Sequence, residues 1–376
     1  MAATKESVLQ ALARVPAPNG APLPQTGALS DVVVTDGKVF FSIAVDAAVA
    51  PQWEPVRKAA EAAVKAVAGV QSVLVALTAE RTASAGGSTS TPAPGRPTAG
   101  RGAPPRAVGV PGVTSIIAVA SGKGGVGKST TAINLALGLR DLGMRVGVMD
   151  ADIYGPSIPK LLAVRERPET IDGTRLRPIS SYGLTVMSIG FLIEEETPMI
   201  WRGPMVISAI TQMLREVEWG ELDVMVVDMP PGTGDAQLTM AQQVPLAGAV
   251  IVSTPQDLAL IDARRGIAMF KRVDVPVLGI VENMSYFLCP KCGERSDVFG
   301  HGGARREAER LGVPFLGEVP LHLLIRELSD AGRPIVATHP DSPQAATYRA
   351  IAAQVRDQLL AEGGAGRPPP KIIIEA

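Results

Sequence analysis

The sequence predicts an α/β fold, in which a doubly wound, mostly parallel sheet follows a small α/β domain. From residue 114 onward, short runs rich in Val and Ile alternate with segments of helical periodicity, which is typical of parallel strands joined by helices. Hydrophobic residues make up 46% of the chain and aromatic residues 4%, a composition that suits strands buried on both faces. The first 80 residues carry a separate pattern of helices and strands.

The large domain is expected to span residues 113–362, with a loose tail over 363–376. A helix is predicted near its end, over residues 343–361. The runs expected to form its strands are 116–120, 145–150, 184–189, 223–228, 247–254, 276–282 and 314–319.

The small domain, residues 1–80, is expected to have the element order α-β-β-α-β. Its clearest local signal is Asp36-Gly37, a two-residue hairpin turn between two apolar runs. A helix is predicted from about Pro55 to Ala68, with Gly69 as the residue that ends it in a left-handed conformation.

Composition and charge exclude several classes of protein. Residues 81–112 hold mainly Ala, Gly, Pro, Ser and Thr and no acidic residue, which predicts a flexible linker.

A net charge of −1 gives no general attraction to nucleic acid or anionic lipid. No apolar run reaches the roughly 20 residues that a bilayer requires, and residues 1–15 lack the apolar core of a secretory signal. We therefore expect a cytoplasmic protein that binds neither nucleic acid nor membrane.

A glycine-rich stretch, GKGGVGKS over residues 122–129, matches the pattern of a phosphate-binding P-loop. An expected strand precedes it and an expected helix follows, as the P-loop NTPase fold requires. The glycines let backbone N–H groups turn toward phosphate oxygens, and the helix N-terminus adds partial positive charge. Lys128 is expected to reach the β- and γ-phosphates, and Ser129 to ligate Mg²⁺. The candidate nucleotide-binding residues are Gly122, Lys123, Gly124, Gly125, Val126, Gly127, Lys128, Ser129 and Thr130.

Two expected strands end in carboxylates that could serve a bound Mg²⁺. Asp228 ends the apolar run 223–228, as in a Walker B strand, and runs into a stiff turn over residues 229–235. Asp152 follows the run 145–150. Strand-end acids are often only helix N-caps, and for Asp235 this interpretation is equally good. For Asp228 and Asp152 the metal-linked role is favoured, because a P-loop requires such partners.

The only two cysteines of the chain, Cys289 and Cys292, have a spacing that suits two thiolates on one metal. An iron–sulfur cluster or an all-thiolate zinc site takes four thiolates. A four-thiolate site is therefore impossible in one chain, but possible in a symmetric dimer to which each subunit contributes one pair.

Three other interpretations of the pair stay open. One is a zinc site within a single chain that adds histidines, with His301 nearer in sequence than His322 and His339. The second is a thioredoxin-like redox pair, which usually opens a helix after a strand. The flanking residues, 285–287 and Gly293, favour a zinc-ribbon-like knuckle instead. The third is a pair of buried thiols, which the intervening Pro-Lys disfavours.

Residues 123–129 resemble the deviant Walker A loop of the MinD/ParA/nitrogenase-iron-protein superfamily, which has a second lysine. Together with other segments, they give residues 114 to about 360 a close resemblance to the Mrp/ApbC family of iron–sulfur cluster carrier ATPases. These segments are DADIYGPS (150–157), WRGP (201–204), DMPPGTGD (228–235), STPQD (253–257), ENMSYFLCPKC (282–292) and FGHGGA (299–304).

This resemblance implies a Mg²⁺-dependent ATPase that forms a homodimer, holds a 4Fe–4S cluster between its subunits and passes it to apo iron–sulfur proteins. A cluster-assembly scaffold is the implied source of the cluster. Lys123 would reach the nucleotide of the partner subunit and act with Lys128 and Asp152 in catalysis. Asp152 would orient the attacking water, Asp228 would hold Mg²⁺ through water, and Asn283 would contact adenine.

The small domain resembles the SufT/PaaD-type iron–sulfur assembly family, but the acidic turn and cysteine usual there are absent. Residues 15–18 (VPAP) and 49–51 (VAP) stand in those places, so we expect a docking module without metal chemistry. Two alternative functions remain: a ParA/MinD-like positioning ATPase, or an ATP-binding scaffold with structural zinc. The expected last helix lacks the basic face of a membrane-binding helix.

Overall fold

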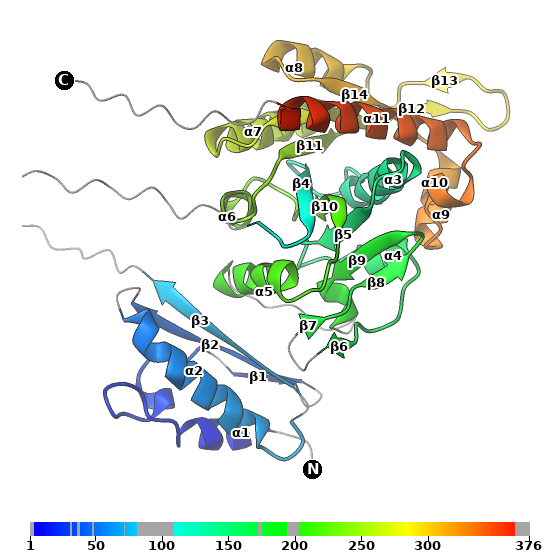
Figure 1. Cartoon of the computed structure of the whole chain (residues 1–376). Helices are drawn as coiled ribbons and strands as arrows, with labels where there is room; N and C mark the ends of the chain where they lie inside the picture. The colour runs from blue at the N-terminus through cyan, green and yellow to red at the C-terminus, as the bar shows by residue number, and fades with distance from the viewer. Residues whose placement is uncertain are drawn as a thin grey trace, which may run out of the picture. The chain divides into compact units, whose positions relative to one another are not determined.

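The computed structural model describes residues 4–30, 32–35, 38–46, 49–70, 72–80, 109–171, 175–193 and 203–364 (Figure 1). The chain divides into two compact units, Met1–Gly102 and Ala103–Ala376. The predicted linker falls mostly on residues 81–108, and most of the predicted tail on 365–376, both outside the described residues. Residues 201–202 of the WRGP segment also lie outside them.

The first unit has the predicted order α-β-β-α-β. Its strands form a sheet in the order β1-β2-β3, in which β1 is antiparallel and β3 parallel to β2. Thr35 of β1 pairs with Lys38 of β2, and the predicted turn residues Asp36-Gly37 lie outside the described residues. The elements are α1 (Lys5–Leu12), η1 (Leu23–Gln25), β1 (Val33–Thr35), β2 (Lys38–Asp46), α2 (Ala50–Lys65) and β3 (Ser72–Glu80).

The predicted bounds of helix α2 were wrong at both ends. The helix begins at Ala50, with Pro51 in its first turn, where a missing N–H costs nothing, and it tolerates Pro55 inside. It ends at Lys65, so Gly69, with φ +88°, belongs to the turn before β3 rather than to the end of the helix.

The second unit contains a nine-stranded sheet in the order β13-β12-β11-β4-β10-β5-β9-β8, with β14 also paired to β12. All the strands predicted for this unit are present, and they run parallel in the order β14-β12-β11-β4-β10-β5-β9. They are β4 (Val113–Ala120), β5 (Val146–Asp150), β9 (Leu184–Ser188), β10 (Leu222–Asp228), β11 (Gly248–Ser253), β12 (Val277–Leu288) and β14 (Phe315–Leu321).

Short strands and one strand end were not predicted. Strand β12 continues to Leu288, beyond its predicted end. The polar residues Glu282, Asn283 and Ser285 interrupt its apolar pattern, but all three are buried. The unpredicted strands are too short or too polar to show alternation, and all pair antiparallel with a neighbour. They are β6 (Thr170–Ile171), β7 (Arg175–Leu176), β8 (Ile179–Ser181) and β13 (Arg295–Ser296).

Helices cover both faces of the sheet (Figure 1). The connection from β4 to β5 advances in one direction along the sheet and that from β10 to β11 in the other. Right-handed crossovers therefore place α3 and α6 on opposite faces. The helices are α3 (Lys128–Asp141), α4 (Ile158–Leu161), η2 (Ile189–Phe191), α5 (Gly203–Arg215), α6 (Asp235–Gln243), α7 (Asp257–Arg272), α8 (Gly303–Leu311), α9 (Leu323–Asp330), α10 (Ile335–Thr338) and α11 (Pro343–Gly364).

Helix α11 buries Tyr348, Ile351 and Val355, so its apolar residues serve the core. It packs closely on α3, since a Cβ atom on Gly138 would lie 2.7 Å from that of Ala352. Among the described residues, none of the helices is long and apolar enough to cross a membrane. Strands β4 and β10 lie side by side where the direction of the connections reverses, which is where doubly wound sheets bind ligands.

Candidate functional site

The predicted P-loop lies between the end of β4 and the start of α3. Gly125 and Gly127 both have φ +80°, a left-handed conformation that favours glycine. Gly122 has no room for a side chain, because a Cβ atom there would collide with the backbone of Asp262 in α7. The structure thus gathers the candidate residues 122–130 into one loop and the first turn of α3.

Lys128 is the centre of a cluster formed by residues that the sequence analysis predicted. Its side chain is 6% exposed, and its Nζ lies 2.8 Å from Asp228 Oδ1 and 3.5 Å from Asp152 Oδ2. Ser129 Oγ lies 3.3 Å from the same Nζ. The structure thus brings together the P-loop and the carboxyl ends of β5 and β10.

Asp150, at the end of β5, organises the segment that carries Asp152. Its Oδ1 accepts from the Asp152 N–H at 3.2 Å, and its Oδ2 accepts from the Ile158 N–H at 3.2 Å and the Ser188 hydroxyl at 2.9 Å. Burial, followed by the negative charge of Asp228, raises the pKa of Asp150 to about 7. Sequence reasoning named this aspartate only within the candidate carboxylate segment 150–152 and did not predict that it organises the loop.

The carboxylates of this cluster fit a divalent cation. Burial raises the pKa of both Asp228 and Asp152, although the Lys128 ammonium opposes the increase. Asp228 Oδ2 is buried and accepts no hydrogen bond. Three carboxylates, those of Asp150, Asp152 and Asp228, thus share the positive charge of Lys128, and an unpartnered buried carboxylate oxygen is a ligand that Mg²⁺ prefers. The predicted Mg²⁺ ligands Ser129 and Asp228 both lie in this cluster, and their binding of the ion stays a prediction.

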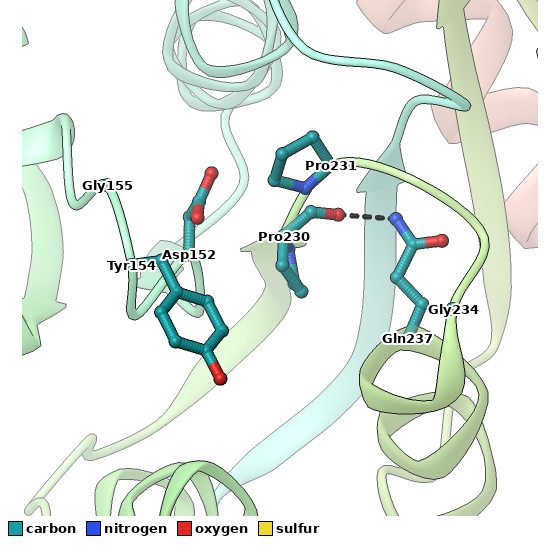
Figure 2. Close-up of a pocket in the computed structure, with 7 residues that line it drawn as sticks. All are labelled: Asp152, Tyr154, Gly155, Pro230, Pro231, Gly234 and Gln237. Carbon is teal, nitrogen blue, oxygen red and sulfur yellow. Dashed lines mark hydrogen bonds between the residues drawn. The ribbon is translucent and has the colours of Figure 1, made fainter. Parts of the chain in front are cut away.

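A cavity of about 380 Å³ lies beside Asp152. Its walls come from the segment after β5 and the turn after β10, together with Gln237 of α6 (Figure 2). The lining residues are Asp152, Tyr154, Gly155, Pro230, Pro231, Gly234 and Gln237. The cavity therefore adjoins the cluster between Asp152, which is expected to orient the attacking water, and the turn that follows Asp228.

Gln237 is a site residue that sequence reasoning missed. Its side chain is 2% exposed, and its Nε2 donates to the Pro230 carbonyl (Figure 2). The amide thereby fixes the turn after Asp228 to α6. A glutamine within a helix gives no signal of such a role, because its partner is a backbone atom. Helix α6 is capped by Gly234, so the N-cap interpretation of Asp235 was wrong.

Lys123, the second lysine of the loop, lies partly exposed. Its Nζ is 3.3 Å from Gln256 Oε1 of the same chain, and its carbonyl accepts from the Ser121 hydroxyl at 2.9 Å. The expected contact with the nucleotide of a partner subunit stays a prediction.

Asn283, on β12, packs against the P-loop. It is 7% exposed, and its Nδ2 donates to the Val126 carbonyl at 2.8 Å. The amide occupies the space that a side chain on Gly127 would need. The structure thus joins β12 to the nucleotide-binding loop, and an adenine contact by Asn283 stays a prediction.

The cysteine pair forms a knuckle between β12 and β13. The Cys289 N–H donates to the Glu294 carbonyl at 2.9 Å, and the Gly293 N–H donates to the Cys289 carbonyl at 2.9 Å. Both thiols are free; Cys289 is partly exposed and Cys292 exposed. A hairpin knuckle with accessible thiols is the predicted zinc-ribbon-like arrangement, rather than a redox pair at a helix start or two buried thiols.

Backbone N–H groups of Cys292 and Lys291 point to the Cys289 thiol and lower its pKa. We therefore expect iodoacetamide to alkylate Cys289 of the metal-free protein at a lower pH than the same cysteine in a CPKC peptide, where the turn is not formed. Labelling across a pH series, read by peptide mass spectrometry, measures this difference. Equal pH profiles in protein and peptide would contradict the knuckle geometry.

The histidines do not join the thiols. Ligand atoms of His301 lie within 4.8 Å of those of Glu282 and Glu318, and the described residues contain no such group of three that includes a cysteine. Arg295 Nη2 lies 2.8 Å from His301 Nδ1. His322 Nδ1 accepts from the Leu324 N–H at the start of α9. The described residues therefore give the single-chain zinc interpretation no support.

A P-loop with a second lysine, strand-end carboxylates beside it and a parallel, doubly wound sheet define a P-loop NTPase of the MinD/ParA-like class. A ParA-type family described as "NUBPL iron-transfer P-loop NTPase" matches residues 112–356. The chain belongs to this family. A second family, described as "Iron-sulfur cluster assembly protein", matches residues 5–75.

Curated relatives agree with the Mrp/ApbC resemblance. The chain is 56% identical over 254 residues to the "Iron-sulfur cluster transfer protein NUBPL" of Dictyostelium discoideum, covering 67% of this chain and 79% of the relative. It is 55% identical over 256 residues to the "Iron-sulfur cluster carrier protein" of Escherichia coli K12, covering 68% and 69%.

Solved structures confirm the fold class. A nucleotide-binding protein from Archaeoglobus fulgidus, in complex with ADP, is similar with a TM-score of 0.54 and 41% identity, covering 62% of this chain and 90% of that one. The cell division ATPase MinD of Pyrococcus furiosus is similar in fold, with a TM-score of 0.50 and 21% identity, covering 65% and 98%.

Proposed function

We propose that this protein is an ATP-hydrolysing carrier that holds an iron–sulfur cluster between two copies of the chain and delivers it to apo-proteins. The observation that carries the proposal is the knuckle, which presents two free, accessible thiols in a P-loop NTPase of an iron-transfer family. The names of the curated relatives support the same cargo.

The number of thiols supports a homodimer. The chain has two cysteines, and a 4Fe–4S cluster takes four thiolates. Two knuckles facing each other across a two-fold axis would supply the full set. The cluster is cargo in this proposal, received from an assembly scaffold and passed to apo iron–sulfur proteins.

The nucleotide site supports Mg²⁺-dependent ATP hydrolysis. Lys128 would bind the β- and γ-phosphates, and Asp152 would orient the attacking water; the ion pair between them and the cavity beside Asp152 support these roles. Ser129 and Asp228 would hold Mg²⁺, which neutralises phosphate charge when bound. Lys123 would complete the site of the partner subunit, and Asn283 Oδ1 would face the adenine amino group.

The remaining proposals concern organisation and compartment. We keep residues 1–80 as a docking module, 81–112 as a linker, 113–362 as the ATPase domain and 363–376 as a tail. Two free thiols suit a reducing compartment such as the cytoplasm. One relative, from Arabidopsis thaliana, is named as mitochondrial, so the compartment differs within the family.

Native mass spectrometry of protein reconstituted with iron and sulfide, in the absence of oxygen, tests the proposal. We expect a dimer that carries the mass of one four-iron cluster. A monomer that holds a single zinc ion would instead move the cysteines to a structural role and leave a P-loop ATPase without this cargo.

A further inference from the structure

Strand β12 carries the residue that touches the P-loop and leads directly into the first thiol of the knuckle. Asn283 lies within the strand, where it pairs with Val319 of β14. Cys289 directly follows Leu288, the last residue of the strand. The nucleotide-binding loop and the cysteine pair are thus joined by the continuous segment 283–289, in which Cys289 lies six positions after Asn283.

At the first end of this segment, Asn283 controls the orientation of a peptide group. Its Nδ2 donates to the Val126 carbonyl at 2.8 Å. No cis peptide bond occurs among the described residues, so the Val126 carbonyl and the Gly127 N–H lie in one plane and point in opposite directions across the C–N bond. By holding the carbonyl toward β12, Asn283 directs the Gly127 N–H away from β12.

Between Asn283 and the knuckle, the strand bends. Met284 has φ +54°, an uncommon conformation for a residue other than glycine, and the register with β14 shifts between Asn283 and Phe287. The buried Glu282 carboxylate holds this bend by accepting from the Ser285 hydroxyl at 2.6 Å and from the Ala304 N–H at 2.7 Å. Because no residue between Asn283 and Phe287 pairs with β14, these two hydrogen bonds, rather than the strand ladder, hold the geometry of the bend.

We propose that Asn283 is a positioning residue that couples phosphate binding in the P-loop to the geometry of Cys289. This inference rests on the proposed function. A phosphate that accepts from the Gly127 N–H polarises the shared peptide group and strengthens its hydrogen bond to Asn283. A more firmly held Asn283 then fixes the bend that follows it and the start of the knuckle. Coupling between two binding sites is reciprocal, so a bound cluster changes nucleotide affinity by the same factor.

The test compares the affinity of the dimer for MgADP with and without the reconstituted cluster. In the wild-type protein we expect the two dissociation constants to differ by about fivefold or more. In Asn283→Leu, which removes the donor and keeps the branched shape of the side chain, this ratio falls to about one while the cluster content stays at one per dimer. The cluster-free variant binds MgADP about three- to tenfold more weakly, since the adenine loses its proposed hydrogen bond to Asn283 Oδ1 and the Val126 carbonyl loses its donor. Asn283→Ala is the second variant, with the same expectation and no bulk to accommodate.

The matched control is Gln354→Leu. Gln354 of α11 also donates a side-chain amide to a backbone carbonyl, that of Leu316 in β14, the neighbour of β12, at 2.9 Å. This variant should keep the wild-type ratio.

The coupling is contradicted by a wild-type ratio of one, by an unchanged ratio in both Asn283 variants, or by an equal loss in Gln354→Leu. A wild-type dimer that holds no cluster would instead overturn the proposed function, and the coupling with it.

Discussion

Replacing Cys289 with alanine is expected to abolish cluster binding while nucleotide binding survives. The substitution removes one thiolate from each subunit, so a dimer retains two of the four that a 4Fe–4S cluster takes. Cys289 lies on a partly exposed knuckle, six residues beyond the strand position that touches the P-loop, so the nucleotide site keeps its contacts. Iron and sulfide content, measured beside the affinity for MgADP, tests both halves of the expectation.

Lys291→Ala is the matched control for Cys289→Ala, because it changes the same knuckle and keeps both thiols. It should bind as much iron as the wild-type protein. If Cys289→Ala also retained the wild-type amount of iron, the bridging site would be wrong. Loss of MgADP binding in Cys289→Ala would instead show that the substitution disturbs the whole unit.

Replacing Lys128 or Asp152 with alanine is expected to lower the rate of ATP hydrolysis by at least about 100-fold, as the loss of one preorganised charged group at a reacting centre typically does. Lys128→Ala also weakens nucleotide binding, because the β- and γ-phosphates lose their ammonium partner. Asp152→Ala leaves the P-loop in place, so its effect should fall on turnover more than on binding. Phosphate release measured under saturating MgATP separates the effect on turnover from the effect on binding.

Lys271→Ala serves as the control for Lys128→Ala, because this exposed lysine of α7 donates to the Leu311 carbonyl at 3.0 Å, far in sequence from the P-loop. It should hydrolyse ATP at the wild-type rate. Normal turnover in both Lys128→Ala and Asp152→Ala would show that the catalytic residues are wrongly assigned. Circular dichroism of each variant separates loss of activity from loss of fold.

Much of the large unit could be predicted from the sequence because its signals are local and strong. Buried parallel strands are typically continuous apolar runs rich in Val and Ile, and each run that the sequence analysis predicted forms a strand. The P-loop depends on glycines that adopt left-handed conformations, as Gly125 and Gly127 do. The site carboxylates Asp152 and Asp228 could be predicted because the carboxyl ends of parallel strands meet at one edge of the sheet.

The parts that were missed depend on contacts between distant segments. Gln237 acts through the carbonyl of Pro230, and Asp150 through the N–H groups of a loop, so neither role shows in residue type. The extension of β12 was not predicted because polar residues from Glu282 onward indicate the end of a buried strand. Glu282 is nevertheless buried, and its carboxylate accepts hydrogen bonds from the Ser285 hydroxyl and the Ala304 N–H. The position of His301 beside Glu282 and Glu318, rather than beside the thiols, likewise follows from tertiary packing.

The ion pairs of Lys128 have a consequence for which form of the nucleotide the protein selects. In the structure the ammonium is already engaged by Asp228 and Asp152. An incoming phosphate that binds the Lys128 ammonium leaves these buried carboxylates without their counter-charge. Breaking such a buried pair costs on the order of 3–5 kcal/mol. A nucleotide that arrives with its divalent cation brings the missing positive charge, whereas bare ADP or ATP does not. On the proposed function, these ion pairs would therefore disfavour metal-free nucleotide before any chemistry takes place.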